Sequence, residues 1–239
     1  MRSSAASDVY KRQVYNCVAA CCAGRLLGLT VKRHLPNYGE FYEQRWFAAA
    51  PMNGAGFIPF AGQDSVPLMG DIVYTCSDPG LEDVRIGVEI CEDLWVPNPP
   101  SVDMALSGGA TVILNASASS EVLGKSAYRR SLVSGQSARL YCAYAYANAG
   151  EGESTTDLVF SGENLIAENG SIVASTSLFS REMAVADVDL EKLMAERRRS
   201  NTWRAGSGPW GICTRLASVS WAPGRTCPAG MCPGSSAQV

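Results

Sequence analysis

The sequence predicts an α/β fold, because segments typical of strands alternate along the chain with segments typical of helices. The run "TVILNAS" at residues 111–117 is continuously apolar, as in a strand buried on both faces. The segment 125–142 then places Tyr128 and Leu132 on one face of a helix. With 239 residues, 46% hydrophobic and 18% charged, the chain suits one domain with a sizeable core, or one domain and a tail.

The first third of the chain predicts strands separated by loops. We expect residues 1–13 to be unstructured and non-native. The alternation around Ala23-Gly24 predicts a hairpin, with strands at 14–21 and 26–32. The further expectations, in chain order, are a loop with aromatic anchors at 36–47, a Gly/Pro/Ala-rich loop at 48–64, and strands at 71–76 and 84–91.

The rest of the domain alternates helices and strands up to residue 202. Ser101 and Ser126 are suitable N-caps for two helices, and Asn169-Gly170 predicts a tight hairpin turn. Acids come early and arginines late in 189–200, as the helix dipole favours. The expected elements are a helix at 102–107, a strand at 111–117, a helix at 125–142, strands at 142–150 and 158–162, a hairpin over 165–176, a strand at 182–190 and a helix at 189–200.

Residues 203–239 differ in character from the rest of the chain. They are rich in Gly, Pro, Ser, Trp and Cys and show no period of 2 or 3.6 residues. Tryptophan and cysteine are rare in solvated linkers, so a shifted reading frame is favoured over a disordered linker. We therefore expect the native domain to span 14–202, with a non-native or disordered tail behind it.

Composition excludes several classes of function. The net charge of −3 offers no basic surface for nucleic acid. The apolar runs are too short for a membrane span, and the N-terminus lacks the apolar core of a signal peptide. We expect a cytoplasmic protein that binds neither nucleic acid nor membrane.

Cysteines are numerous, but their pattern does not predict a metal site. There are nine, with no CxxC pair, and a single histidine, His34. Zinc ribbons and sites with several histidines are therefore not expected, and we predict no bound metal. Most of these thiols are expected to be small core residues.

The stretch "RIGVEICEDLWVPNPPS" ends a predicted strand on Cys91, directly before Glu92 and Asp93. A strand that turns sharply presents its last side chain at the sheet edge, where following N–H groups can bind an oxyanion. The residues alone leave two interpretations open, a core cysteine and a nucleophile. Adjacent acids raise a thiol pKa, so a reactive Cys91 needs a nearby cation. Lys32, at the end of another strand, is the candidate, although a solvated lysine fits the same pattern.

Three long motifs, in order, carry a resemblance to a known family: "VKRHLPNYGEFYEQRWF", "GVEICEDLWVPNPPS" and "YANAGEGESTTDLVFSGENLIAENGSI". Together they resemble the glutaminase domain of glutamine-dependent NAD⁺ synthetase, which belongs to the carbon–nitrogen hydrolase (nitrilase-like) superfamily. The resemblance runs from about Val14 to Thr202. It implies a four-layer α-β-β-α sandwich, here truncated at the N-terminus.

The resemblance also implies roles for particular residues. Cys91 matches the nucleophile and Lys32 the lysine of the family's Glu–Lys–Cys triad. In acyl transfer, Lys32 and the N–H of Glu92 would then stabilise the oxyanion. Glu40 lies where related amidases carry a second glutamate that orients the lysine and the substrate. The implied substrate-binding residues are Tyr38, Glu92, Trp95, Ser119 and Lys125, with L-glutamine as the substrate.

The sequence also departs from the family. The family's general-base glutamate lies in an "FPE"-type motif before the lysine, and none precedes Lys32. The "SGGxDS" pyrophosphate loop of the ATP-using synthetase domain is absent too. We expect a fragment with negligible glutaminase activity and no cofactor of its own. ATP, Mg²⁺ and homo-oligomers would belong to the full-length protein, which carries the synthetase domain. The alternatives are another amidase or nitrilase, and a catalytically inactive fragment.

Overall fold

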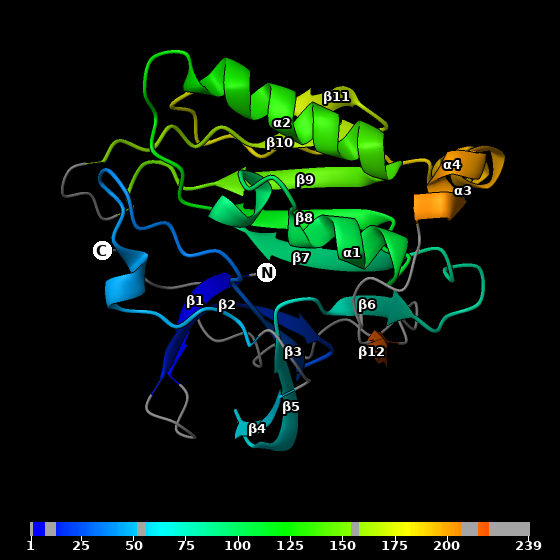
Figure 1. Ribbon diagram of the computed structural model, residues 1–239, viewed down its shortest axis with the longest axis horizontal. Coiled ribbons are helices and arrows are strands. Elements are labelled where there is room, and N and C mark those ends of the chain that lie inside the picture. The colour runs from blue at the N-terminus through cyan, green and yellow to red at the C-terminus, as the bar shows by residue number, and fades with distance from the viewer. Residues whose placement is uncertain (1, 8–12, 52–55, 154–157, 207–214, 220–239) are drawn as a thin grey trace.

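The computed structural model describes residues 2–7, 13–51, 56–153, 158–206 and 215–219 (Figure 1). These residues form two β-sheets with helices beside one of them. The strands and helices alternate after residue 85, so the α/β prediction is confirmed.

The larger sheet has seven strands and carries the chemistry of the site. Its centre is the parallel trio β7, β8 and β9, in which each strand follows its neighbour through a helix or a helical turn. In spatial order the strands are β11 (Ser171–Ser175), β10 (Leu165–Glu168), β9 (Ala143–Asn148), β8 (Val112–Ser117), β7 (Arg85–Ile90), β6 (Val73–Cys76) and β12 (Arg215–Val219).

The smaller sheet has five strands. The hairpin of β2 and β3 turns at Ala23-Gly24, where both residues have positive φ, as the sequence predicts. The spatial order is β1 (Arg2–Ser7), β2 (Val14–Cys22), β3 (Arg25–Val31), β5 (Gln63–Met69) and β4 (Gly56–Phe60).

Helices α1 and α2 cover one face of the larger sheet (Figure 1). The close approach of α1 requires Gly87, because a Cβ there would lie 2.7 Å from the sulfur of Met104. The helical segments are α1 (Pro100–Leu106), α2 (Lys125–Leu140), α3 (Leu190–Arg199), α4 (Asn201–Gly206) and the 3₁₀ turns η1 (Glu43–Arg45) and η2 (Cys91–Leu94). No helix of the described residues is long and apolar enough to cross a bilayer.

Strand alternation explains how the two sheets pack together. On β2, Val18 and Ala20 join Val88 and Ile90 of β7 in one apolar cluster between the sheets. Their neighbours on β2 point the opposite way, into a second cluster within the smaller sheet. The described residues thus form three of the four expected layers, helices, sheet and sheet.

Two regions that were expected to lack regular structure contain strands. Arg2–Ser7 pairs antiparallel with β2, although 1–13 was expected to be unstructured. The expected loop at 48–64 contains β4 and the start of β5, a hairpin that the parallel pairing of β5 with β3 supports. Such long-range pairing leaves no local pattern in the sequence.

Two expected strands do not form. Residues 158–162 make only an isolated bridge at Phe160. Residues 182–189 are irregular, and Met183 and Val185 are 82% and 73% exposed. Alternation of apolar residues there therefore marks no buried face.

The helix caps also differ from expectation. Pro99 and Gly124, not Ser101 and Ser126, occupy the N-cap positions of α1 and α2. In the expected tail, α4 and β12 are regular, and β12 pairs in parallel with β6, so "disordered" is wrong for these two segments. The other residues beyond 206 lie outside the described part of the chain.

Candidate functional site

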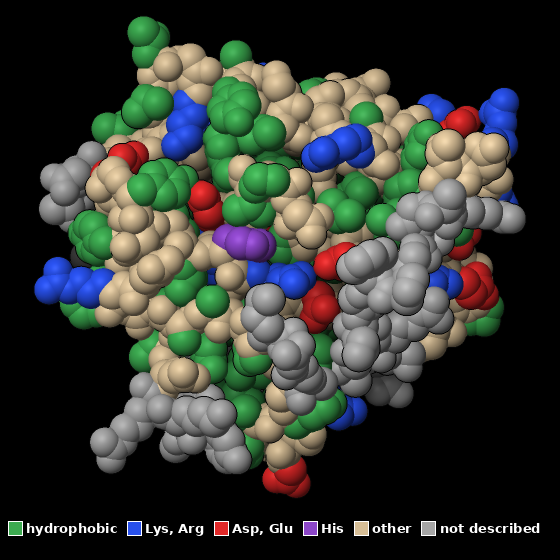
Figure 2. All heavy atoms as spheres, viewed as in Figure 1, with side chains coloured by type: hydrophobic (Ala, Val, Ile, Leu, Met, Phe, Trp, Pro, Cys, Tyr) green, Lys and Arg blue, Asp and Glu red, His purple; other side chains and the backbone are tan. Residues whose placement is uncertain are grey.

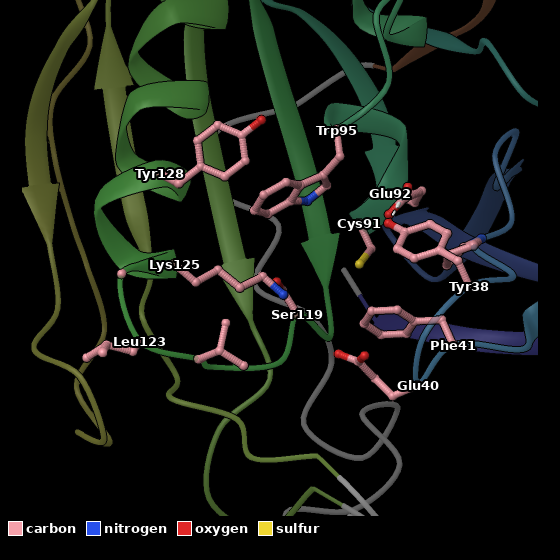
Figure 3. Close-up of a pocket in the computed structure, with 13 residues that line it drawn as sticks. Tyr38, Glu40, Phe41, Cys91, Glu92, Trp95, Ser119, Leu123, Lys125 and Tyr128 are labelled. Carbon is pink, nitrogen blue, oxygen red and sulfur yellow. Dashed lines mark hydrogen bonds between the residues drawn. The ribbon is translucent and has the colours of Figure 1, made fainter.

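Cys91 lies at the carboxyl end of β7, as the first residue of η2. Its φ of +49° is in the left-handed region, which is uncommon for a side chain larger than glycine. The amide N–H of Cys91 donates to Asn115 Oδ1 at 3.1 Å, which anchors the turn to β8. The thiol borders the apolar cluster between the sheets and also lines a cavity (Figure 3).

The cavity has a volume of about 480 Å³ and opens beside the ends of β7 and β8. Seven of the eight site residues predicted from the sequence line it, namely Tyr38, Glu40, Cys91, Glu92, Trp95, Ser119 and Lys125. Figure 3 shows them converging from three separate parts of the chain. Pro36, Phe41, Val122, Leu123, Gly124 and Tyr128 complete the lining.

Lys32 is the eighth predicted residue, and it is not among the residues that line the cavity. It follows β3 directly, is 1% exposed, and donates to both carboxylate oxygens of Glu43, at 2.6 and 2.8 Å. Burial raises the pKa of the Cys91 thiol, while the positive charge of Lys32 lowers it. Lys32 therefore acts on the thiol as a buried cation.

Glu43 is a residue that the sequence reasoning missed. The expected partner of the lysine was Glu40, but Glu40 instead accepts a hydrogen bond from Ser120 Oγ at 3.2 Å. The correction has a geometric reason, because Glu43 opens the turn η1, which faces the end of β3. Because positions 40 and 43 are both glutamates, the sequence alone could not show which of them binds Lys32.

Lys125 brings a second positive charge to the cavity. Its Nζ donates to Ser120 Oγ at 3.0 Å and lies 5.4 Å from the ring centre of Trp95. Burial and the nearby charge of Arg129 lower the pKa of Lys125. Lys125 and Glu40 thus reach the same space from opposite sides, bridged by one serine (Figure 3).

Tyr38 and Glu92 are joined across the opening of the cavity. The Tyr38 hydroxyl donates to Glu92 Oε1 at 2.8 Å. Burial and this carboxylate raise the pKa of Tyr38 to about 12, so the hydroxyl keeps its proton near neutral pH. Glu92 therefore holds the aromatic ring beside the thiol.

A buried ion-pair cluster fixes the segment that carries Ser119 and Lys125. Arg129, which is fully buried on α2, bonds to both Glu121 and Glu163. Glu163 also accepts from Ser126 and Arg130. The cluster ties the start of α2 to the segment before β10. No group of three or more potential metal ligands occurs among the described residues.

A thiol at a strained strand end, beside a buried lysine–glutamate pair in a two-sheet α/β structure, defines a hydrolase-type site that uses a cysteine. The family model described as carbon–nitrogen hydrolase matches residues 4–198. The chain belongs to the carbon–nitrogen hydrolase family. The match begins ten residues earlier than Val14, where the sequence resemblance was expected to begin.

Relatives of known name point to one branch of that family. The chain is 43% identical over 197 residues to the glutamine-dependent NAD(+) synthetase of Mycobacterium tuberculosis, covering 81% of this chain and 28% of that protein. The human protein of the same name is 34% identical over 194 residues, covering 77% of this chain and 26% of the relative. The chain therefore spans little more than a quarter of the length of these relatives.

Solved structures agree on the fold. A glutamine-dependent NAD(+) synthetase from Cytophaga hutchinsonii superimposes with a TM-score of 0.63 at 33% identity, covering 81% of this chain and 31% of that one. A carbon–nitrogen hydrolase from Helicobacter pylori gives a TM-score of 0.62 at 17% identity, covering 82% and 64%. The second likeness supports the nitrilase-like fold alone.

Proposed function

We propose that this chain is the glutamine-hydrolysing part of a glutamine-dependent NAD⁺ synthetase. The observation that carries the proposal is the opening of Cys91 onto a cavity that also holds Lys125 and Glu40. An amino-acid amide needs such a set, a nucleophile for the side chain and opposite charges for the two α-groups. The volume of the cavity is within the range of roughly 300–1,000 Å³ typical of small-molecule sites.

The proposed reaction is acyl transfer through the thiol. The Cys91 thiolate attacks the side-chain carbonyl carbon of glutamine, and the oxygen becomes negatively charged. Lys32 and the N–H of Glu92 would stabilise this oxyanion. The C–N bond then breaks as the nitrogen takes up from water the proton that the thiol released on ionising, so ammonia leaves and a glutamyl thioester remains. Water hydrolyses the thioester to glutamate and restores the thiol.

The remaining predicted residues would hold the substrate. Lys125 is suited to the α-carboxylate, and Ser119 to a hydrogen bond with an α-group. Tyr38 and Trp95 form apolar walls for the methylene chain. Glu40 is retained as a group that orients the substrate. It bonds to Ser120, while Glu43 is the residue that binds Lys32.

The wider assignment follows from the named relatives. In the full-length protein, the ammonia would reach a synthetase domain of the same chain, which would use ATP and Mg²⁺ to convert deamido-NAD⁺ to NAD⁺. This domain would need no cofactor of its own. Homo-oligomers are proposed for the full-length protein.

Protection of Cys91 from alkylation tests the proposal without requiring turnover. The chain is treated with iodoacetamide at increasing L-glutamine, and modification of the Cys91 peptide is followed by mass spectrometry. We expect L-glutamine to slow the labelling at least fivefold, and Lys125→Met to raise the glutamine concentration needed for half of that protection about tenfold or more. Equal protection by D-glutamine would overturn the proposal.

Propionamide, a neutral aliphatic amide, tests the other branch of the family. Stronger protection by propionamide than by L-glutamine would favour a general amidase, for which the apolar lining by Val122 and Leu123 would be suited. Glutamate release is measured in parallel. Without the "FPE" glutamate we expect turnover ~10²–10⁴-fold below that of an intact triad.

A further inference from the structure

The residue two positions after Cys91 is a carboxylate with no access to substrate. Asp93 is 1% exposed and does not line the cavity. A buried carboxylate is costly unless donors satisfy it, so its partners show what it holds together. All of them belong to two segments, the residues before Cys91 and the residues after Lys32.

One oxygen of Asp93 faces the lysine segment. Asp93 Oδ1 accepts from the backbone N–H of His34 at 2.8 Å and of Arg33 at 3.2 Å. The imidazole Nδ1 of His34 also lies 3.0 Å from it. His34 itself reaches the surface, as the purple side chain in Figure 2 shows, while the carboxylate lies beneath it.

The other oxygen faces the cysteine strand. Asp93 Oδ2 accepts from the backbone N–H of Ile90 at 3.1 Å, one residue before the strained Cys91, and at 3.4 Å from that of Arg33. A single carboxylate thus spans the gap between the end of β3, in one sheet, and the end of β7, in the other. Lys32 and Cys91 are the residues directly adjacent to the two bonded backbone segments.

We infer that Asp93 is a positioning residue, which sets the place of the Lys32 ammonium relative to the Cys91 thiol by bonding both backbones. The inference rests on the proposed function, because it assigns Cys91 the reactive thiol. Asp93 acts through Lys32 and touches neither the substrate nor the sulfur. Its effect is therefore visible in the reactivity of the thiol.

Several titratable groups besides Lys32 face the thiol, and they are the same in every variant that is compared. Glu43 from η1 opposes the lysine, and Lys125 on α2 adds a positive charge across the cavity. The hydroxyls of Tyr38 and Tyr146, on a loop and on β9, also face the thiol and stay protonated over the range used.

Asp93→Asn cuts the link on one side only. The asparagine oxygen can still accept from the lysine segment, but its NH₂ group faces the N–H of Ile90, and two donors cannot bond. Cys91 alkylation by iodoacetamide is measured by peptide mass spectrometry from pH 6 to 10. We expect the profile to move to higher pH by at least half a unit, with labelling at pH 8 slowed about three- to tenfold.

A double-mutant cycle shows whether Asp93 acts through the lysine. In a Lys32→Met background, Asp93→Asn should no longer move the Cys91 profile to higher pH, because loss of the nearby Asp93 charge by itself can only lower the thiol pKa. An undiminished shift in that background would overturn the inference. So would a folded Asp93→Asn protein whose melting temperature falls while its Cys91 profile stays that of the parent.

Asp189→Asn is the matched control. Asp189 Oδ1 caps α3 through the N–H of Lys192 at 2.9 Å, and α3 lies at the end of the large sheet opposite the carboxyl end of β7 (Figure 1). Asparagine is as good an N-cap as aspartate, so this substitution removes one negative charge and should leave both the melting temperature and the thiol profile nearly unchanged. If Asp93→Asn does not fold, Asp93→Glu is used, because it keeps every donor partnered while lengthening the link. It should shift the profile in the same direction by a smaller amount.

Protection by L-glutamine distinguishes a failure of the proposed function from a failure of the inference about Asp93. A parent protein that L-glutamine does not protect refutes the proposed function, while a shifted Asp93→Asn profile would still support the link between Lys32 and Cys91. A protected parent with an unshifted Asp93→Asn profile refutes only the inference.

Discussion

At the scale of single residues, the site depends on groups held in unfavourable states. Cys91 has a left-handed backbone, and Lys32 is a buried ammonium. Each of these residues needs a stabilising partner. Asn115 bonds to the backbone of Cys91, and Glu43 binds the ammonium of Lys32. The chemistry of the thiol therefore depends on residues that do not themselves line the cavity.

Glu43→Gln tests the buried ion pair. The substitution keeps the shape of the side chain but leaves the charge of Lys32, whose side chain is 1% exposed, without its counter-ion. Breaking a buried pair from one side costs about 3–5 kcal/mol. We expect the free energy of unfolding, measured by urea denaturation, to fall by about that amount.

Glu151→Gln is the matched control for this substitution. Glu151 pairs with Arg181 at the surface, where the two side chains are 64% and 79% exposed. Water solvates both partners after the pair is broken, so the urea midpoint should not change measurably. An equal loss in both variants would contradict the assignment of Lys32 as a buried cation.

Residue types at the site could be predicted from the sequence, but their partners could not. Cys91, Tyr38, Trp95, Ser119 and Lys125 all reach the cavity as the motifs implied. The choice between Glu40 and Glu43 needed the position of η1 relative to β3, which no local pattern contains. Asp93 was visible beside Cys91, but its bonds cross from one sheet to the other.

At the scale of elements, β7 carries a second buried acid behind the cysteine. Glu89 accepts from the backbone N–H of Ser101 on α1 at 2.9 Å and from the hydroxyl of Tyr144 on β9. It thereby joins the strand to the helix and to the far strand of the parallel trio. Burial raises the pKa of Glu89 to about 7, from an ordinary value of 4.5.

This pKa predicts a pH dependence of stability with a definite sign. Between pH 4.5 and 7 the folded chain keeps a proton on Glu89 that the unfolded chain has lost. Stability from this group is thus greatest below pH 4.5 and declines as pH rises to 7. Relative to Glu89→Gln, which cannot ionise, the parent should lose about 2–3 kcal/mol of unfolding free energy between pH 5 and 8.

Urea denaturation of both proteins at several pH values measures that difference directly, since other titrating groups affect both alike. A gap between parent and variant that stays constant over the range would show that Glu89 is not protonated in the fold. The elements around it were predicted well, because β8 is a continuous apolar run and α2 repeats apolar residues on one helix face. β4 and β5 were missed because Pro67 interrupts the apolar pattern of β5.

At the scale of the whole molecule, the site exists only where the two sheets meet. Lys32 follows a strand of the small sheet and Cys91 a strand of the large one. The cluster of Val18, Ile72 and Val88 between the sheets is what keeps the two strand ends side by side. We therefore predict that the two sheets unfold together, in one transition.

Two buried thiols report on the two sheets separately. Cys17 lies on β2 of the small sheet and Cys142 beside β9 of the large sheet, and neither side chain is exposed. Pulse labelling with iodoacetamide across a urea series, read by peptide mass spectrometry, should modify both over the same range. Ile72→Ala removes apolar contacts that the sheets share. It should lower the free energy of unfolding reported by both thiols equally, by about 2–4 kcal/mol. Labelling of Cys17 at clearly lower urea than Cys142 would show that the small sheet opens alone, and Lys32 would then leave the thiol before the large sheet unfolds.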